Sequence, residues 1–187
     1  MNIKQRIKYL IGAIKCRLKN IKTHESVYIG KNVHITNGKN IILGADVQIR
    51  PYCDIFAAEK FVIGKGTDIG TRNRIAGNIE IGEYVLFGPD NYICSQDHNY
   101  ADINKPIISQ GALDIKNNGH NTLKIGDGSW IGTHVAIIGD VHIGKNCVIG
   151  ANSVVTKDIP DYSVAVRIPA KIIKQYNFTT NSWEKIN

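Results

Sequence analysis

Residues 125–156 read IGDGSW-IGTHVA-IIGDVH-IGKNCV-IGANSV-VT, and this stretch decides the fold of the chain. An aliphatic residue recurs at every sixth position, namely Ile125, Ile131, Ile137, Ile143, Ile149 and Val155. A strand repeats every two residues and an α-helix about every 3.6, so neither alone gives a period of six. A short strand followed by a turn does give it, and stacked hexapeptides of this kind predict a parallel β-helix.

The same period extends over most of the chain. It runs in phase through Ile63, Ile69, Ile75, Ile81, Phe87 and Ile93. Before residue 63 it passes through Ile29, Ile35, Leu43, Ile49 and Ile55, with two-residue slips at 37–38 and 57–60. We therefore predict an all-β domain over residues 27–166, in which three hexapeptide sides close a coil of about 18 residues.

Two further positions of the hexapeptide carry structural information. Glycine often follows the aliphatic residue, and we expect it to supply backbone freedom near the corner. The fourth residue after the aliphatic is small or β-branched, which assigns Cys53 and Cys147 to the core. Asn73 and Asn91 share this phase and lie 18 residues apart, so we predict that they stack as an amide ladder, each bonding the next.

The period stops between Ile93 and Ile125. The interruption, residues 95–123, begins SQDHNY and contains Pro106 and Gly111, so it reads as a loop. A loop of this length inside a regular repeat is uncommon and is often functional. After residue 156 the repeat ends, and for the C-terminal segment 167–187 we predict a short helix over 170–176 followed by a polar tail.

Residues 1–22 predict a basic amphipathic helix. Its apolar residues fall on one face: Ile3, Ile7, Leu10, Ile14, Leu18 and Ile21. Seven Lys and Arg residues and no acidic residue occur here, whereas the rest of the chain carries 16 of each sign and is neutral. Two interpretations stay open, a helix packed under the domain or at a subunit contact, and a helix lying in an anionic membrane interface.

Composition narrows the remaining classes of function. Because the net charge of +7 resides in the N-terminal segment, the body of the protein gives no signal for nucleic-acid binding. The four cysteines show no CxxC or Cys/His metal spacing and are expected to be free thiols in a reducing cytoplasm. No apolar run is long enough to span a bilayer, and no signal peptide is recognised.

One histidine stands apart from the other five. The six are His24, His34, His98, His120, His134 and His142. Only His98 opens the long interruption, five residues after the last in-phase aliphatic residue. Its imidazole could reach beyond the wall of the coil into a groove, and its ordinary pKa near neutrality suits a general base.

The sequence resembles the hexapeptide-repeat acyltransferases, especially the galactoside/maltose O-acetyltransferases and the polysaccharide and lipopolysaccharide O-acetyltransferases. The resemblance rests on residues 125–164, on His98 in the loop and on PAKII at 169–173. It implies a left-handed parallel β-helix and a homotrimer with active sites between subunits. It also implies that acetyl-CoA is the co-substrate, that no metal is required and that His98 is the catalytic base.

The resemblance also implies a set of residues for the co-substrate. Trp130 lies beside the cofactor groove in this reading, and Thr133, Ala151, Thr156 and Lys157 line the pantetheine arm. Lys171 and Lys174 fall where the family places basic residues near the phosphates of CoA. The chain departs from the family where a glycine commonly precedes PAK, because it has Arg167-Ile168 there, and Arg167 is itself a candidate phosphate ligand.

The acceptor is less sharply indicated. Asn78, Asp97 and Tyr100 are the candidate contacts, although Asp97 and His98 should point apart as neighbours in an extended chain. We expect a sugar or glycan hydroxyl as the acceptor, in surface polysaccharide or lipopolysaccharide biosynthesis. The enzyme would be cytoplasmic, with peripheral contact at the inner face of the membrane through residues 1–22.

Three alternatives remain at the level of sequence. One is N-acetylation of an amino sugar nucleotide by the same fold. Another is a zinc protein like the γ-class carbonic anhydrases, for which His98, His134 and His142 would be the candidate ligands, although their spacing differs. The third is a structural trimeric module without catalytic activity.

Overall fold

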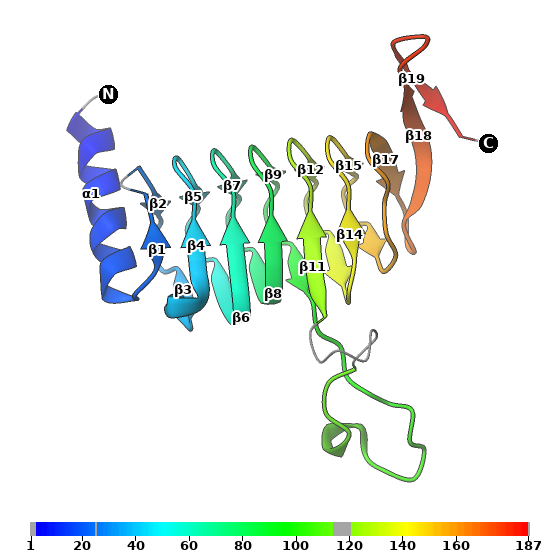
Figure 1. Ribbon diagram of the computed structural model, residues 1–187, viewed down its shortest axis with the longest axis horizontal. Helices are drawn as coiled ribbons and strands as arrows, with labels where there is room; N and C mark the ends of the chain where they lie inside the picture. Colours follow the sequence, from blue (N-terminus) through cyan, green and yellow to red (C-terminus); the bar gives the residue numbers. More distant parts are fainter. Residues whose placement is uncertain (1–2, 25, 114–120, 187) are drawn as a thin grey trace.

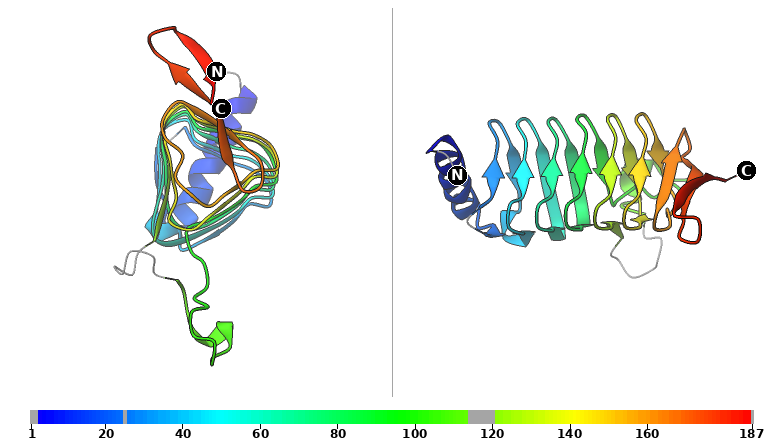
Figure 2. Two further views of the ribbon diagram at one scale, coloured as in Figure 1. Left: turned by 90° about the vertical axis from the view of Figure 1, so that its right-hand side faces the viewer. Right: turned by 90° about the horizontal axis from the view of Figure 1, so that it is seen from above.

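Short parallel strands stack in three columns that form the sides of a triangular prism (Figures 1 and 2). This computed structural model describes residues 3–24, 26–113 and 121–186. The predicted parallel β-helix is confirmed, because all strand pairs within the prism are parallel.

The strands divide among the three sides as follows. The first side contains β1 (Lys22–Thr23), β4 (Ile41–Leu43), β11 (Thr122–Ile125) and β14 (His142–Ile143). The second contains β2 (Tyr28–Ile29), β5 (Gln48–Ile49), β7 (Asp68–Ile69), β9 (Leu86–Phe87), β12 (Trp130–Ile131), β15 (Val148–Ile149) and β17 (Ser163–Val166). The third contains β3 (His34–Thr36), β10 (Tyr92–Cys94), β13 (Ala136–Ile138) and β16 (Val154–Val155), and β6 (Asp54–Ile63) and β8 (Arg74–Ile81) run from the third side onto the first.

The aliphatic residue of each hexapeptide points into the prism and lies directly over its counterpart in the next coil. On the third side Ile55 pairs with Ile75, Ile75 with Ile93, and Ile93 with Ile137, and all four are buried. Burying such a side chain contributes about 1.5–3 kcal/mol. The period of six therefore records the core positions along the whole prism.

The glycines after the aliphatic residues serve close stacking, and the expectation that they supply backbone freedom is wrong. A Cβ on Gly132 would lie 2.7 Å from the backbone nitrogen of Ala151, and one on Gly64 2.5 Å from the backbone of Gly82. Left-handed backbone occurs instead at the third residue after the aliphatic, at the two corners that flank the second side. These residues are Asn32, Asp46, Tyr52, Gly66, Arg72, Tyr84, Asp90, Gly128, His134, Asn146, Asn152 and Tyr162.

Extra residues are accommodated at one corner, where the third side turns into the first. Ile35 and Ile55 are 20 residues apart, whereas Ile75 and Ile93 are 18 apart, and each pair spans one coil. The additional residues form the 3₁₀ turn η1 (Gly38–Asn40) and an irregularity of β6 after Ala57. The long loop leaves the prism at this same corner, after β10, and returns at β11 (Figure 1).

Asn73 and Asn91 are buried on successive coils as predicted, but the predicted bonds between their side chains are not formed. The amide oxygen of Asn73 accepts the backbone N–H of Asn91 at 3.0 Å, and that of Asn91 accepts the N–H of Val135 at 2.7 Å. Each amide nitrogen donates to the carbonyl oxygen of Gly88. The two side chains therefore satisfy backbone groups at the corner, where the coil turns and its own ladder is interrupted.

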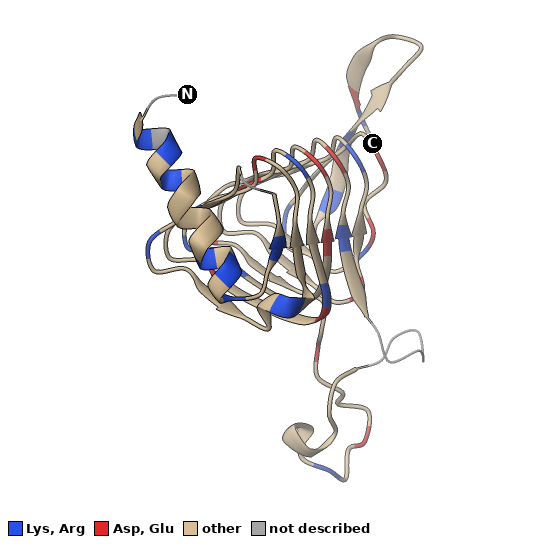
Figure 3. Cartoon of the chain, turned by 60° about the vertical axis from the view of Figure 1, so that its left-hand side comes forward, with Lys and Arg blue, Asp and Glu red and all other residues tan. Residues whose placement is uncertain are grey.

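The helix α1 (Ile3–Leu18) crosses the open end of the first coil (Figures 2 and 3). Gly12 and Cys16 face the prism, and a Cβ on Gly12 would clash with the carbonyl oxygen of Val27. The predicted apolar stripe lies on the other face and is exposed, so it does not pack under the domain; only Ile21, beyond the helix, is buried. In the described part of the chain no helix is long and apolar enough to cross a bilayer.

The predicted C-terminal helix over 170–176 is wrong. The segment forms β18 (Lys171–Asn177), which pairs antiparallel with β17 and with β19 (Ser182–Lys185). The last coil leaves β17 with an open edge, and a segment rich in Ile and Tyr suits a strand that pairs with it. The aromatic ring of Tyr176 packs edge-on against those of Phe178 and Trp183 along this hairpin.

Replacing a buried corner amide should destabilise the prism. Asn91→Ala removes the acceptor for the N–H of Val135 and the donor to Gly88, and we expect unfolding free energy to fall by about 2–4 kcal/mol. Denaturant unfolding would measure it, with the exposed Asn104→Ala as the matched control. Equal stability of the two variants would contradict a structural role for Asn91.

Candidate functional site

His98 lies at the base of the arm that the long loop forms. Its backbone pairs antiparallel with Ala112, the N–H of Asn99 donates to the carbonyl of Gly111 at 3.0 Å, and the N–H of Leu113 donates to the carbonyl of Asp97 at 2.8 Å. The arm is therefore closed at its base by a short two-stranded ladder. The position of His98 is fixed by backbone pairing, although its side chain is exposed.

The side chain of Gln110 holds the middle of the arm together. Its amide oxygen accepts the N–H of Asp102 at 3.0 Å, and its amide nitrogen donates to the carbonyls of Asp102 and Lys105 at 2.9 and 2.8 Å. Lys105 in turn pairs with the Asp102 carboxylate at 2.9 Å, and this contact lowers the pKa of Asp102. The 3₁₀ turn η2 (Ile107–Ser109) lies between Lys105 and Gln110, so the Gln110 side chain closes the loop that contains it.

A groove of about 430 Å³ separates the base of the arm from the third side of the prism. The arm and the prism line it together, with Tyr92, Cys94, Gln96, Asp97, His98, Ile108, Gly111, Ala112 and Ile138. Tyr92 and Cys94 point outward because Ile93 between them points into the core. His98 therefore shares the groove with outward side chains of the third side, which include the thiol of Cys94 and the apolar Ile138.

Asp97 does not orient the imidazole of His98. Its carboxylate accepts the backbone N–H of His98 at 2.8 Å, which agrees with the expectation that the two side chains point apart. Among the described residues, no hydrogen bond or ion pair to the imidazole is found. The ring is therefore accessible to a molecule that enters the groove.

Thr156 and Lys157 follow the third side along the same corner as the arm. Cys94 pairs with Ile138, and Ile137 pairs with Val155 in the next coil, so the residues after Val155 continue this edge. Both side chains are exposed. The structure thus brings these two predicted cofactor residues to the edge that carries His98.

Trp130, Thr133 and Ala151 lie elsewhere on the prism. Trp130 points outward from the second side, between Leu86 and Val148, and is half exposed. Thr133 and Ala151 follow at the corner between the second and third sides, where the Thr133 hydroxyl donates to the carbonyl of Pro89 at 3.0 Å. One chain does not bring this group together with His98.

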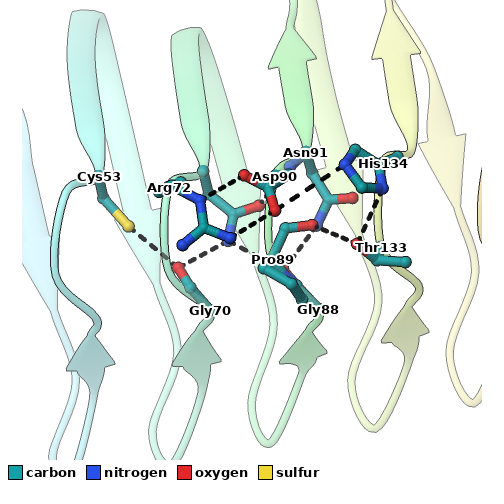
Figure 4. A network of polar contacts seen from close by, with 10 residues as sticks. Cys53, Gly70, Arg72, Gly88, Pro89, Asp90, Asn91, Thr133 and His134 are labelled. Carbon is teal, nitrogen blue, oxygen red and sulfur yellow. Dashed lines mark hydrogen bonds and ion pairs between the residues drawn. The ribbon is translucent and has the colours of Figure 1, made fainter.

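A polar network runs along the corner beside Thr133 (Figure 4). Arg72 holds the carboxylate of Asp90 with two hydrogen bonds of 2.7 and 2.8 Å, and this contact lowers the pKa of Asp90. The imidazole of His134 lies 3.9 Å from the same carboxylate and 3.2 Å from the Thr133 hydroxyl. Successive coils are thereby linked through exposed charges, and such links contribute little to stability individually.

The three predicted phosphate ligands belong to the C-terminal end. Arg167 follows β17 with a φ of 91°, a conformation that side-chain-bearing residues rarely adopt. Its carbonyl oxygen accepts the N–H of Val154 at 3.2 Å. Lys171 and Lys174 lie on β18, where Lys174 is opposite Lys185 of β19.

The candidate acceptor residues differ in accessibility. Asn78 is buried, and its amide oxygen accepts the backbone N–H groups of Glu59 and Lys60 at 2.9 and 3.1 Å. These bonds stabilise the irregular corner of β6, so a structural task occupies that oxygen. Tyr100 is exposed on the arm, two residues beyond His98.

Sequence reasoning missed Tyr92 and Cys94 as lining residues of the groove. The alternation of the strand around Ile93 could have identified both, because the residues on each side of a core position must face outward. The pKa of Tyr92 is raised, first by the neighbouring Cys94 and then by burial.

The three histidines of the zinc hypothesis lie on different parts of one chain. His98 is on the arm, His134 is at the corner beside Thr133, and His142 is on the first side in β14. Within the described residues, no three His, Cys, Asp or Glu side chains gather into a metal-binding group. His120 lies outside the described residues.

Comparison with known proteins gives consistent matches. The family model described as bacterial transferase hexapeptide (six repeats) matches residues 122–157. A probable acetyltransferase of Mycobacterium tuberculosis is 33% identical over 82% of this chain and 55% of its own length, so the chain spans about half of that relative. WbbJ of Escherichia coli, named as a putative lipopolysaccharide biosynthesis O-acetyl transferase, is 32% identical over 68% of this chain and 74% of its own length.

Solved structures share the fold at low sequence identity. A mutant of AntD, an N-acyltransferase from Bacillus cereus, in complex with dTDP-4-amino-4,6-dideoxyglucose and coenzyme A, has a TM-score of 0.75 and 20% identity over 91% of each chain. PerB from Caulobacter crescentus, in complex with CoA and GDP-perosamine, has a TM-score of 0.59 and 18% identity over 89% of this chain and 66% of its own.

The cysteines should differ sharply in reactivity. Burial raises the pKa of Cys53 to about 11 and also raises the pKa of Cys16 and Cys147. At pH 8 only about one Cys53 thiol in a thousand would then be ionised. We expect a thiol reagent to label the partly exposed Cys94 first and the other three only on unfolding. Persistence of the fast phase in Cys94→Ser would contradict this assignment.

Glycine in place of Arg167 should raise the free energy of unfolding. Arg167→Gly relieves the left-handed conformation, and we expect a net stabilisation of about 1 kcal/mol after the greater entropy of the unfolded chain is counted. Thermal unfolding would measure it. Asn152→Gly is the control, because asparagine tolerates its φ of 59° and little change is expected there. A destabilised Arg167→Gly would show that the side chain makes a compensating contact.

Proposed function

Because this chain belongs to the bacterial hexapeptide-repeat transferases, we propose that it is an acetyltransferase that moves an acetyl group from acetyl-CoA to a sugar hydroxyl. The acceptor would be a glycan of surface polysaccharide or lipopolysaccharide biosynthesis. The observation that carries the proposal is the exposed His98 at the mouth of the groove between arm and prism. The relatives of that family named as acetyltransferases support the reaction class.

His98 would act as the general base. Its unprotonated imidazole nitrogen takes the proton of the acceptor hydroxyl while that oxygen attacks the carbonyl carbon of the thioester. The carbonyl oxygen becomes negative and requires a donor, which a backbone N–H or a hydroxyl of the next subunit would supply. When the C–S bond breaks, the imidazolium returns the proton to the sulfur of CoA, leaving an acetyl ester on the sugar.

The residues present fit acetyl-CoA as the co-substrate. An extended thioester arm needs an apolar wall, and the outward residues Cys94 and Ile138 provide one beside His98. The phosphates need cations, and Arg167, Lys171 and Lys174 lie toward the C-terminal end of the prism. The proposed cofactor set is completed by Trp130, Thr133, Ala151, Thr156 and Lys157.

A homotrimer would reconcile the two groups of candidate residues. His98, Thr156 and Lys157 lie at one corner of the prism, and Trp130, Thr133 and Ala151 lie on the second side or at its corner with the third. A threefold arrangement can face the first group of one subunit with the second group of the next. The site would then form between subunits, and for its location we propose the cytoplasm, with peripheral contact at the inner face of the membrane.

Removing the base should abolish most of the transfer. We expect His98→Ala to lower kcat by roughly 10²–10⁴-fold, with an unchanged unfolding midpoint and unchanged oligomeric state. The assay follows release of the CoA thiol with sugar acceptors. His142→Ala is the matched control, since His142 is also exposed but lies on the first side. An unchanged rate for His98→Ala would remove this residue from the mechanism.

N-acetylation of an amino sugar nucleotide is the second candidate, favoured by the fold shared with AntD and PerB. A panel of free sugars, lipid-linked glycans and amino sugar nucleotides separates the two reactions by which acceptor is consumed. Metal analysis of the purified protein tests the zinc hypothesis, and stoichiometric zinc would contradict the transferase assignment.

A further inference from the structure

The outward face of α1 is an exposed apolar surface. It consists of Ile3, Ile7, Leu10, Ile11, Ile14 and Leu18, with exposed fractions between 46% and 77%. Successive helical residues are rotated by about 100°, so these six span one continuous sector of the helix. A contiguous apolar face of this kind marks a surface that is covered in use.

The opposite face of α1 is already occupied. Gly12 and Cys16 pack against the first coil, and the Lys15 ammonium donates to the carbonyl oxygens of Ile29 and Gly30 at 3.0 and 2.7 Å. Lys8 lies over the ring of Tyr28 at 5.6 Å. These contacts fix how the helix is rotated, so its apolar face must point away from the prism.

The remaining cations border the apolar face. At about 100° per residue, Arg6 and Arg17 fall along one edge and Lys4 along the other. All three are exposed, and the first 22 residues contain no Asp or Glu. An apolar sector with cations on both edges complements the acyl chains and the negative headgroups of an anionic lipid surface.

We propose that α1 lies in the plane of an anionic lipid bilayer, with its apolar face in the acyl boundary and its cations among the headgroups. A neutral or hydrophobic protein partner would leave the cations without function. One step rests on the proposed function: its trimer would present three such helices at the same end of three parallel prisms. Multivalent contact would then strengthen the binding of each single helix.

This docking sets the distance between the site and the lipid. The helix crosses the end of the prism, so the prism stands away from the bilayer along its own axis (Figures 1 and 3). On the third side β10 is the fourth strand, following β3, β6 and β8, and neighbouring strands lie about 4.8 Å apart. With the helix radius added, His98 lies on the order of 20 Å above the surface. A glycan anchored to lipid and several sugars long matches that height.

Vesicle sedimentation tests the docking. Wild-type protein should bind vesicles of equal parts phosphatidylcholine and phosphatidylglycerol and not vesicles of phosphatidylcholine alone. Ile7→Gln/Leu10→Gln/Ile14→Gln should weaken binding at least tenfold. Arg6→Gln/Arg17→Gln should weaken it roughly 25-fold, at about fivefold for each cation, and high salt should have the same effect.

Controls separate docking from folding and from catalysis. Ile186→Gln changes an exposed apolar residue at the opposite end of the prism and should leave vesicle binding unchanged. Each variant should keep the wild-type unfolding midpoint and its rate on a soluble acceptor. Vesicle binding without acetyl transfer by the wild type would contradict only the proposed function.

Three outcomes would overturn the docking proposal. The first is equal binding by the wild type and the triple Gln variant, and the second is failure of the wild type to bind anionic vesicles. In the third, the particle mass doubles in solution and the triple Gln variant restores the smaller species. That result would mean that a second copy of the protein covers the apolar face.

Discussion

The stacking of one coil on the next is the constraint on which the rest of this molecule depends. Parallel strands must approach to about 4.8 Å, and where glycine follows the core aliphatic residue, its backbone lies so close to the next coil that a Cβ cannot be accommodated. The turn that follows is then made by a residue with left-handed backbone. At the corners the hydrogen-bond ladder between strands is interrupted. Buried polar side chains there, such as Thr67 and Ser129, form hydrogen bonds with the backbone groups that the ladder does not pair.

This constraint decides where the chain can carry function. Two corners of the prism are built from the repeated turn, whereas the corner between the third and first sides takes insertions of two residues and a whole arm. The arm therefore emerges beside the outward residues of the third side. His98 gains its groove because the permissive corner adjoins that wall, and its backbone ladder with Ala112 keeps it there.

The two ends of the prism are covered in different ways. A stack of coils has an exposed core at each end, and α1 covers the first coil with Gly12 and Cys16. At the other end, the hairpin of β18 and β19 extends the sheet from β17. Because α1 needs only its small residues for this cover, its larger apolar side chains remain available to another surface.

The hexapeptide period by itself determined the parallel β-helix, the core positions including Cys53 and Cys147, the slips and the interruption that contains His98. These are local properties, because each follows from which residues can occupy one position of a repeating unit. Only the tertiary structure decided what depends on neighbours distant in sequence. It showed that the amides of Asn73 and Asn91 bond backbone rather than each other, that residues 171–177 form a strand because β17 has an open edge, and that the apolar face of α1 points outward because Gly12 packs on Val27. It also separated Trp130, Thr133 and Ala151 from His98, since residues in different columns of a prism lie apart however close they are in sequence.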